Sequence, residues 1–246
     1  VVSAPAAFEI TADRAQFGID EITPASGGNV GRVTAAIHGA AIPDDATPYL
    51  RGPDGQEIWA WPIQRVDPAE LYATFDLTGR PPGLYDLVMD RLGADVAMLT
   101  QAFDVRAGSG PRLETNVIAP EQVRRGWIFP VTVEWSNTGD TDMASPLLRM
   151  TNPASLDFSL DPFLESTFGS DVQFVGYSTT GPAGVLQPGD RESVTLWSLA
   201  STWVGRYDFT LSGVAEEWSN LQPEPIDWAA LEPLYRPPAV ADETEW

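Results

Sequence analysis

The stretch Leu71-Tyr72-Ala73-Thr74-Phe75-Asp76-Leu77 decides the fold, because its apolar and polar side chains alternate strictly. Successive side chains of a β-strand point to opposite faces of the sheet, so this pattern predicts a strand with one buried and one solvated face. Val131–Ser136 and Tyr207–Ser212 alternate in the same way in the second half of the chain. We therefore expect an all-β protein built from half-buried strands.

Turn residues separate this stretch from similar runs on both sides. The chain has 22 Pro and 21 Gly, and they recur at roughly the 8–12-residue spacing that is typical of a β-sandwich. The segment Pro53-Asp54-Gly55-Gln56 indicates a hairpin turn. In the first half we expect strands at Phe17–Ile22, Val30–His38, Tyr49–Arg51, Glu57–Trp61, Leu71–Leu77, Leu84–Met89 and Ala97–Val105.

A short segment of small residues, Ala107–Pro111, is the best candidate for a domain boundary, because it is flexible and ends in a stiff Pro. We expect an immunoglobulin-like β-sandwich over residues 13–107 and a second one over 111–222. Residues 223–246 are expected to form a short helix, which Asp227 begins and Pro233 ends, followed by an acidic tail. The predicted fold is all-β, with two tandem sandwiches and a short C-terminal helical segment.

One short motif occurs twice. Ala7-Phe8-Glu9-Ile10 is repeated as Ala102-Phe103-Asp104-Val105, an offset of 95 residues that matches the size of one sandwich domain. We therefore expect residues 1–12 to be the last strand of, or a linker from, a preceding repeat. The chain also starts at Val1 without a signal peptide, which favours a segment of a longer protein.

The composition excludes several classes of function. The 246 residues include 35 acidic residues and 14 Arg, with no Lys, no Cys and a net charge of -21. Nucleic acids and anionic membranes are excluded as partners, because both are bound through basic side chains. Thiol nucleophiles, disulfides and Lys-based crosslinks are impossible. No apolar run is long enough for membrane insertion.

Oxygen ligands are the remaining choice for a metal site, since His38 is the only His. Asp140 and Asp142 occupy alternate positions in the turn-rich segment Asn137–Asp142, and short loops wrap calcium with carboxylates spaced in this way. The segment does not have the EF-hand pattern, and a plain turn explains it equally well. We expect no required cofactor, with calcium as the ion that this loop would bind.

Three of the nine Trp suggest a carbohydrate-binding surface. Trp59 and Trp61 share one strand face opposite Ile58, so both indoles lie outside if Ile58 points inward. Trp197 is offset from Leu196 and could also point outward. The alternative is that these rings pack under loops or against the neighbouring domain.

The sequence gives little support for catalysis. His38 would be the only imidazole base for a hydrolase, and no Gly-x-Ser-x-Gly motif occurs. The adjacent pair Glu216-Glu217 is the carboxylate pair that a glycosidase would suggest, but adjacent side chains of an extended segment point to opposite sides. We expect no catalytic residues and no enzymatic activity.

Two families of bacterial repeats resemble these sequences. The first half resembles the immunoglobulin-like IPT/TIG repeats in the stretches Ser26–Gly31, Val33–Gly39, Leu71–Leu77, Pro82–Leu87 and Ala102–Val105. The second half is similar to CARDB-like adhesion-related sandwiches in Val131–Asp140 and Leu186–Asp190.

Both kinds of repeat occur in very large secreted and cell-surface proteins of bacteria. The resemblance therefore implies an extracellular or cell-surface spacer, stalk or adhesion scaffold without catalytic residues. Its partners would be neighbouring repeats of the same polypeptide, and beyond these glycans or another cell-surface protein. The alternatives are a carbohydrate-binding module and an accessory segment of a secreted hydrolase.

Overall fold

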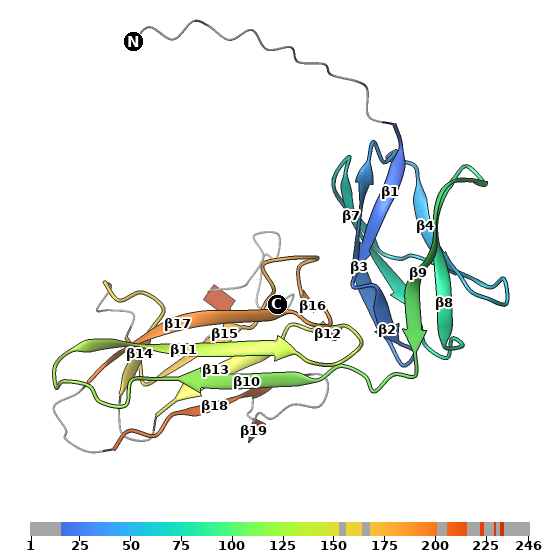
Figure 1. Ribbon diagram of the computed structural model, residues 1–246. Helices are drawn as coiled ribbons and strands as arrows, with labels where there is room; N and C mark the ends of the chain where they lie inside the picture. Colours follow the sequence, from blue (N-terminus) through green and yellow to red (C-terminus); the bar gives the residue numbers. More distant parts are fainter. Residues whose placement is uncertain are drawn as a thin grey trace, which may run out of the picture.

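The computed structural model describes residues 16–152, 156–163, 168–200, 206–215, 222–223, 229 and 232–233, without the side chains of 94–96 and 222–223. These residues form an all-β structure with several sheets. Figure 1 shows two lobes, which we call the N-terminal lobe (residues 16–106) and the C-terminal lobe (residues 113–215).

Two sheets make up the N-terminal lobe. One has the strand order β1-β3-β7-β6 and the other has the order β2-β9-β8-β4-β5. All neighbours are antiparallel except β2 and β9, which are parallel. The strands are β1 (Gly18–Thr23), β2 (Ser26–Gly28), β3 (Arg32–Ala40), β4 (Thr47–Arg51), β5 (Glu57–Trp59), β6 (Ile63–Asp67), β7 (Glu70–Asp76), β8 (Gly83–Arg91) and β9 (Ala94–Arg106).

The core of this lobe lies between the two sheets. Leu71, Ala73 and Phe75 of β7 are fully buried, as the alternation of that strand predicts. Phe103 and Val105 of β9 close the core from the other sheet.

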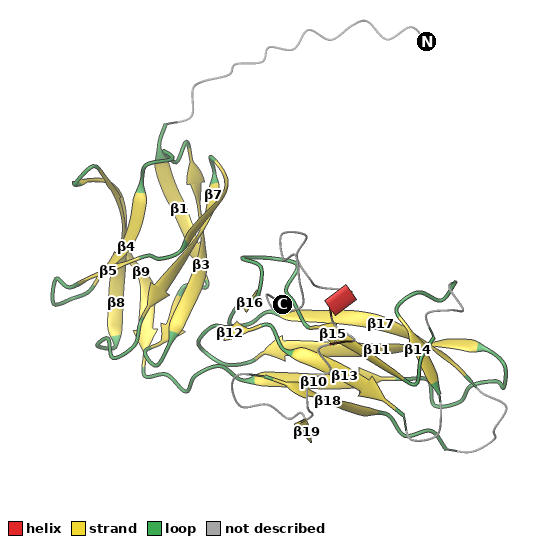
Figure 2. Ribbon diagram, turned by 180° about the vertical axis from the view of Figure 1, so that it is seen from behind, coloured by secondary structure: helices red, strands yellow, loops and turns green. Residues whose placement is uncertain are grey.

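The C-terminal lobe has the sheets β10-β11-β17-β14 and β15-β13-β18-β19 and the small pair β12-β16. Figure 2 shows the same arrangement from behind. The strands are β10 (Leu113–Ile118), β11 (Ile128–Asn137), β12 (Met143–Ala144), β13 (Leu147–Thr151), β14 (Asp157–Ser159), β15 (Asp171–Val175), β16 (Val185–Leu186), β17 (Arg191–Leu199), β18 (Thr210–Val214) and β19 (Gln222–Pro223).

A separate hydrophobic cluster fills the C-terminal lobe. Val131, Val133 and Trp135 of β11 are buried in it, and Trp135 packs against Phe174 with ring centroids 6.0 Å apart. Burial of Trp135 confirms the alternation expected for Val131–Ser136. The strand predicted from Tyr207 begins later, at Thr210.

The strand predicted over Glu57–Trp61 is shorter, because the chain changes sheets. β5 ends at Trp59, and the Trp61 backbone N–H then donates to the Thr74 carbonyl of the other sheet (2.8 Å). Trp61 and Pro62 are joined by a cis peptide bond. The short strands β2 and β6 were not among the predicted strands.

Several predictions lie outside the described residues. These are the assignment of residues 1–12 to a preceding repeat, the Glu216-Glu217 pair and nearly all of the C-terminal segment 223–246. Within the part of the chain that is described, no helix has the length and apolar character needed to cross a membrane.

Candidate functional site

The junction between the lobes centres on the carboxylate of Asp140. Its Oδ2 accepts hydrogen bonds from the Ser109 backbone N–H (2.7 Å) and hydroxyl (3.2 Å), and its Oδ1 accepts one from the Gly110 N–H (2.9 Å). The Gly108 N–H donates to Asn29 Oδ1 (3.0 Å). The segment that the sequence predicts to be a flexible linker therefore has its backbone bonded to both lobes.

Glycines let the two backbones approach each other here. The Gly28 N–H donates to the Asp140 carbonyl (2.8 Å), and a Cβ on Gly28 would collide with Asp140 Oδ1. A Cβ on Gly139 would collide with the Gly110 carbonyl oxygen. Glycine is required at both positions, because a Cβ on Gly28 would push the lobes apart and a Cβ on Gly139 would displace the linker.

Asp142 extends the junction along the outer face of β3. Its backbone N–H donates to the Arg32 carbonyl (2.8 Å), and its Oδ2 accepts a hydrogen bond from the Thr34 hydroxyl (2.6 Å). The hydroxyls of Thr34 and Thr74 are 2.7 Å apart, so Thr74 donates to Thr34 when Thr34 donates to Asp142. Both threonines are buried, although their strand face would otherwise meet solvent.

Burial raises the pKa of the Asp142 carboxyl from 3.8 to about 6. The hydrogen bond from Thr34 opposes this shift, and the nearby charge of Asp190 adds to it. The other carboxylate oxygen, Oδ1, is buried without a hydrogen-bond partner. An ionised carboxylate at this position is destabilising, because the hydrogen bonding from Thr34 does not replace its lost hydration.

Two further contacts join the lobes. The Gln187 side-chain amide donates to the Thr34 carbonyl (2.7 Å). Tyr72 lies near the Gly181 backbone, and burial together with the Glu70 charge raises the pKa of its hydroxyl. The junction thus combines an acidic loop, the outer face of the β3–β7 pair and the segment before β17.

These contacts bear on the calcium prediction for Asp140 and Asp142. The Asp140 oxygens already accept protein N–H groups, and Asp142 accepts the Thr34 hydroxyl. Among the described residues, no group of three His, Asp or Glu side chains is arranged to hold a metal ion. Calcium binding at this pair stays a prediction, and the arrangement itself joins two lobes.

A cleft of about 260 Å³ lies beside the junction, and His38, Glu70, Tyr72 and Asp190 are among its lining residues. Burial raises the pKa of Asp190 despite the hydrogen bond from the Gln187 N–H. No serine lies among the described residues that line this cleft. His38 therefore has no neighbouring serine nucleophile there.

The three candidate Trp residues lie at different places. Ile58 is buried, Trp59 is 47% exposed and Trp61 is 80% exposed, so both rings point outward. Packing under loops is thus wrong for Trp61. The two rings do not extend from one sheet, because the chain crosses to the β7 sheet between them. Trp197 is half-buried on the other lobe, on the outer face of β17.

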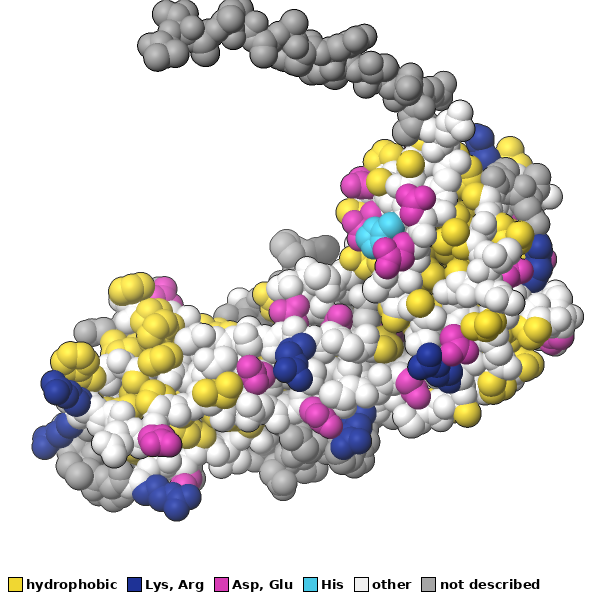
Figure 3. Space-filling model, viewed as in Figure 1, with side chains coloured by type: hydrophobic (Ala, Val, Ile, Leu, Met, Phe, Trp, Pro, Cys, Tyr) yellow, Lys and Arg dark blue, Asp and Glu magenta, His cyan; other side chains and the backbone are white. Residues whose placement is uncertain are grey.

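Sequence reasoning missed Thr34, Thr74 and Gln187 as junction residues. Figure 3 shows acidic side chains over both lobes, so acidity by itself does not distinguish the junction. Thr34 and Thr74 are paired on neighbouring strands whose opposite faces are apolar, and this pattern is the signal that the sequence contains. Thr is equally common on a strand face that contacts solvent, so the pattern by itself does not identify the junction.

Comparisons with known proteins give no family assignment. No protein-family model matches the sequence, and a search of curated proteins finds no relative. Among solved structures, the chain is similar to the native conformation of E. coli alpha-2-macroglobulin, with 14% identity and a TM-score of 0.22. The match covers 83% of this chain and 14% of the alpha-2-macroglobulin chain.

Proposed function

We propose that this chain is a non-enzymatic spacer or scaffold segment of a large extracellular or cell-surface bacterial protein. In this proposal the N-terminal lobe is an IPT/TIG-like sandwich and the C-terminal lobe is a CARDB-like sandwich. Neighbouring repeats of the same polypeptide are the first partners that it meets. The segment acts by holding two sandwiches in a fixed relative orientation.

The observation that carries this proposal is the hydrogen-bonded junction around Asp140. A spacer transmits orientation only if its linker cannot rotate freely, and Asp140 accepts N–H groups from both residues at the centre of the linker. The hydrogen bonds of Asp142 and Gln187 with β3 lie outside the linker and add a second point of attachment. Two attachment points separated in space oppose rotation as well as separation.

A carbohydrate-binding module is the second candidate, because Trp61 and Trp59 are exposed. Exposed indoles stack on sugar rings when they lie in one plane. Here Trp59 instead stacks on Tyr49, with ring centroids 4.6 Å apart, and Trp61 follows on the other sheet. This arrangement supports the spacer more strongly than the binding module.

Nitrogen-15 relaxation of the backbone amides tests the proposal. We expect both lobes to report one rotational correlation time, as a single rigid body does. Replacing Asp140, Asp142 and Gln187 together by Ala should give the lobes separate, shorter correlation times, because the side-chain bonds at both attachment points are then lost. Asp54→Ala is the matched control, since Asp54 also accepts a backbone N–H, from Gln56 (3.0 Å), but lies in a hairpin turn. Independent tumbling of the wild-type lobes would contradict the proposal.

A further inference from the structure

The C-terminal lobe has an open edge between its two sheets. β14 pairs only with Trp197–Leu199 of β17, so the first half of β17 has no strand on that side within the described residues. β15 is an edge strand of the opposite sheet and ends at Val175. Because no described strand covers this edge, the space between the two sheets is accessible from it.

A pocket of about 200 Å³ lies at this edge. Both sheets contribute lining residues, and most of these are apolar: Trp135, Leu160, Phe174, Val175, Tyr177 and Val194. Trp135 and Phe174 are buried. Leu160 and Tyr177 are about half exposed, so they lie at the mouth. Pockets for drug-sized molecules have roughly 300–1,000 Å³, so this volume suits a single ring.

The indole N–H of Trp135 is a buried donor without an acceptor. Trp135 is only 4% exposed, and no described residue accepts a hydrogen bond from its Nε1. The carbon bonded to Nε1, Cδ1, lies 3.3 Å from the position that a Cβ would take on Gly176. Gly176 stands between the lining residues Val175 and Tyr177. The edge of the ring that carries the N–H therefore faces this wall of the pocket, where the donor can bind a ligand.

Glu192 supplies an acceptor on the same side of the sheet. It is the direct cross-strand partner of Trp135, so both side chains lie on the inner face. Its Oε1 accepts hydrogen bonds from the Thr179 backbone N–H (2.8 Å) and hydroxyl (2.6 Å), and both residues line the pocket. These bonds hold the carboxylate in place and leave Oε2 to accept a further hydrogen bond.

From this geometry we infer that the pocket binds a neutral phenolic ring. A hydroxyl both accepts and donates a hydrogen bond, so one phenolic oxygen accepts from the Trp135 indole and donates to Glu192. The ring then packs among the apolar side chains, with Phe174 and Tyr177 as aromatic neighbours. The site lies in the C-terminal lobe alone, so it goes beyond the spacer role and does not depend on a rigid junction.

The same groups disfavour other ligands. A sugar carries hydroxyls around its whole ring, and those that face Phe174 and Val194 would be buried without partners. A carboxylate would meet the Glu192 carboxylate in a chain of net charge -21. A purely apolar ring fits the volume but leaves the Trp135 indole N–H without an acceptor.

Titration of the nitrogen-15-labelled full chain with phenol tests the site. The indole N–H cross-peak of Trp135 should shift in a saturable way, with a Kd of about 1 mM for a ligand of so few atoms. Toluene is the matched probe, since a methyl group replaces the hydroxyl. Phenol should bind at least as tightly as toluene, whereas a pocket without polar partners favours toluene, which has no hydroxyl to desolvate. The anion 4-hydroxybenzoate should bind about tenfold or more weakly than phenol.

Two variants locate the binding. Val194→Phe fills the pocket and should abolish the shift, and Thr195→Phe, at the next and exposed position of β17, is the matched control. Trp135→Phe keeps an aromatic ring without the N–H. Followed through the backbone amide of Tyr177, it should lose about tenfold in affinity for phenol relative to toluene. Circular dichroism establishes that each variant is folded, and the comparison of phenol with toluene in the wild type needs no variant.

N-acetyltyrosine amide distinguishes two sources of the same ring. Binding tighter than that of phenol assigns the pocket to a tyrosine side chain of another protein, and weaker binding assigns it to a free phenolic compound. Either result supports a phenolic site.

Three results would overturn the inference. These are a Trp135 indole cross-peak that does not shift with about 10 mM phenol, toluene that binds more than about tenfold tighter than phenol, and a folded Val194→Phe variant that binds phenol as the wild type does.

Discussion

Replacing Asp142 by Asn tests the energetics of the junction. Burial raises the pKa of this carboxyl from 3.8 to about 6, so the folded protein binds its proton more tightly than the unfolded chain does. The stabilisation that this proton provides is fully present below the pKa that Asp142 has in the unfolded chain. It is lost as the pH rises through the pKa of about 6 that Asp142 has in the folded protein. A shift of this size corresponds to about 3 kcal/mol at most, since one pKa unit is worth about 1.4 kcal/mol.

The amide that replaces the carboxyl in Asp142→Asn does not titrate, and it resembles the protonated acid in shape. We expect the free energy of unfolding of Asp142→Asn, relative to wild type, to increase by about 2–3 kcal/mol between roughly pH 4 and pH 8. Urea unfolding followed by Trp fluorescence at a series of pH values measures this difference. Because it is a difference between two proteins, the titration of the other carboxylates largely cancels.

Asp76→Asn provides a control of opposite sign. Hydrogen bonds from Thr78 lower the pKa of Asp76 in the folded protein. The contribution of Asp76 to stability is therefore fully present above the pKa that it has in the unfolded chain, and it is lost as the pH falls. The stability of this variant relative to wild type should therefore decrease, not increase, with rising pH. A pH-independent difference for Asp142→Asn, or one with the sign of Asp76→Asn, would refute the description of Asp142 as a buried, poorly compensated carboxylate.

Three further predictions concern ions and ligands. Sodium chloride should raise the melting temperature, because screening reduces the self-repulsion of a chain with net charge -21; a melting temperature that falls with salt would contradict this. Millimolar calcium and magnesium should stabilise the protein equally; a calcium-specific increase lost in Asp140→Ala and Asp142→Ala would instead establish a calcium site. The chain should not bind insoluble polysaccharides in pull-down assays, and specific binding lost in a folded Trp59→Ala, Trp61→Ala variant would favour the carbohydrate-binding module.

Alternation predicts the strands that have one apolar face. The run from Leu71 to Leu77 and the inward position of Trp135 follow from it, because burial between two sheets requires period-two hydrophobicity. β2 has no such signal, since Ser26-Gly27-Gly28 has almost no side-chain bulk and forms a strand only by pairing with the end of β9. Tertiary pairing of this kind is not written in the local sequence.

The junction could be predicted only in part. Asp140 and Asp142 stand out in the sequence as loop carboxylates, but their partners Ser109, Gly110 and Thr34 are far away along the chain. Carboxylates at alternate positions have the same spacing whether they bind an ion or backbone N–H groups. In the fold the linker lies against this loop, and its N–H groups bind the Asp140 carboxylate.

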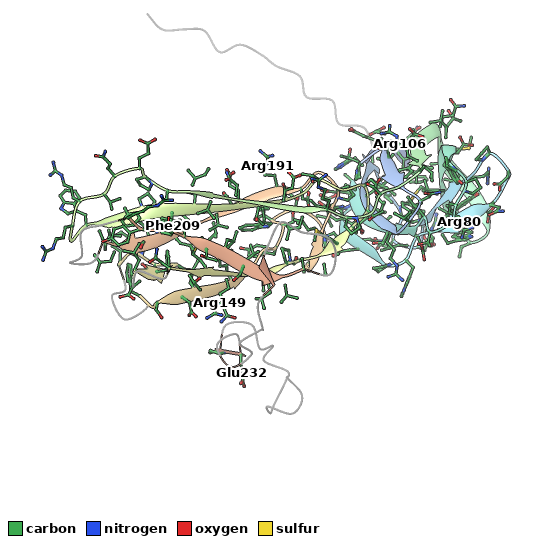
Figure 4. All side chains as sticks on the ribbon, turned by 90° about the horizontal axis from the view of Figure 1, so that it is seen from below. Arg80, Arg106, Arg149, Arg191, Phe209 and Glu232 are labelled. Atoms are coloured by element: carbon green, nitrogen blue, oxygen red, sulfur yellow. The ribbon has the colours of Figure 1, made fainter. Side chains whose placement is uncertain are left out.

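Some side chains have roles that only the sheet registers reveal. Figure 4 shows Arg191 and Arg149 on different sheets of the C-terminal lobe, where Arg149 forms an ion pair with Asp171 (2.6 Å). The pairing of Pro130 with Trp197 also depends on the register between β11 and β17. The sequence predicts that Trp197 points outward, and the register shows that Pro130 lies beside it.

A distance measurement between the lobes tests the rigid spacer most directly. The chain has no Cys, so Gln64→Cys and Glu121→Cys, both at exposed positions of different lobes, allow specific spin labelling. Double electron–electron resonance should give one narrow distance distribution, and the same labels in an Asp140→Ala, Asp142→Ala, Gln187→Ala background should give a broad one. A broad distribution in the otherwise wild-type chain would contradict a fixed orientation of the two lobes.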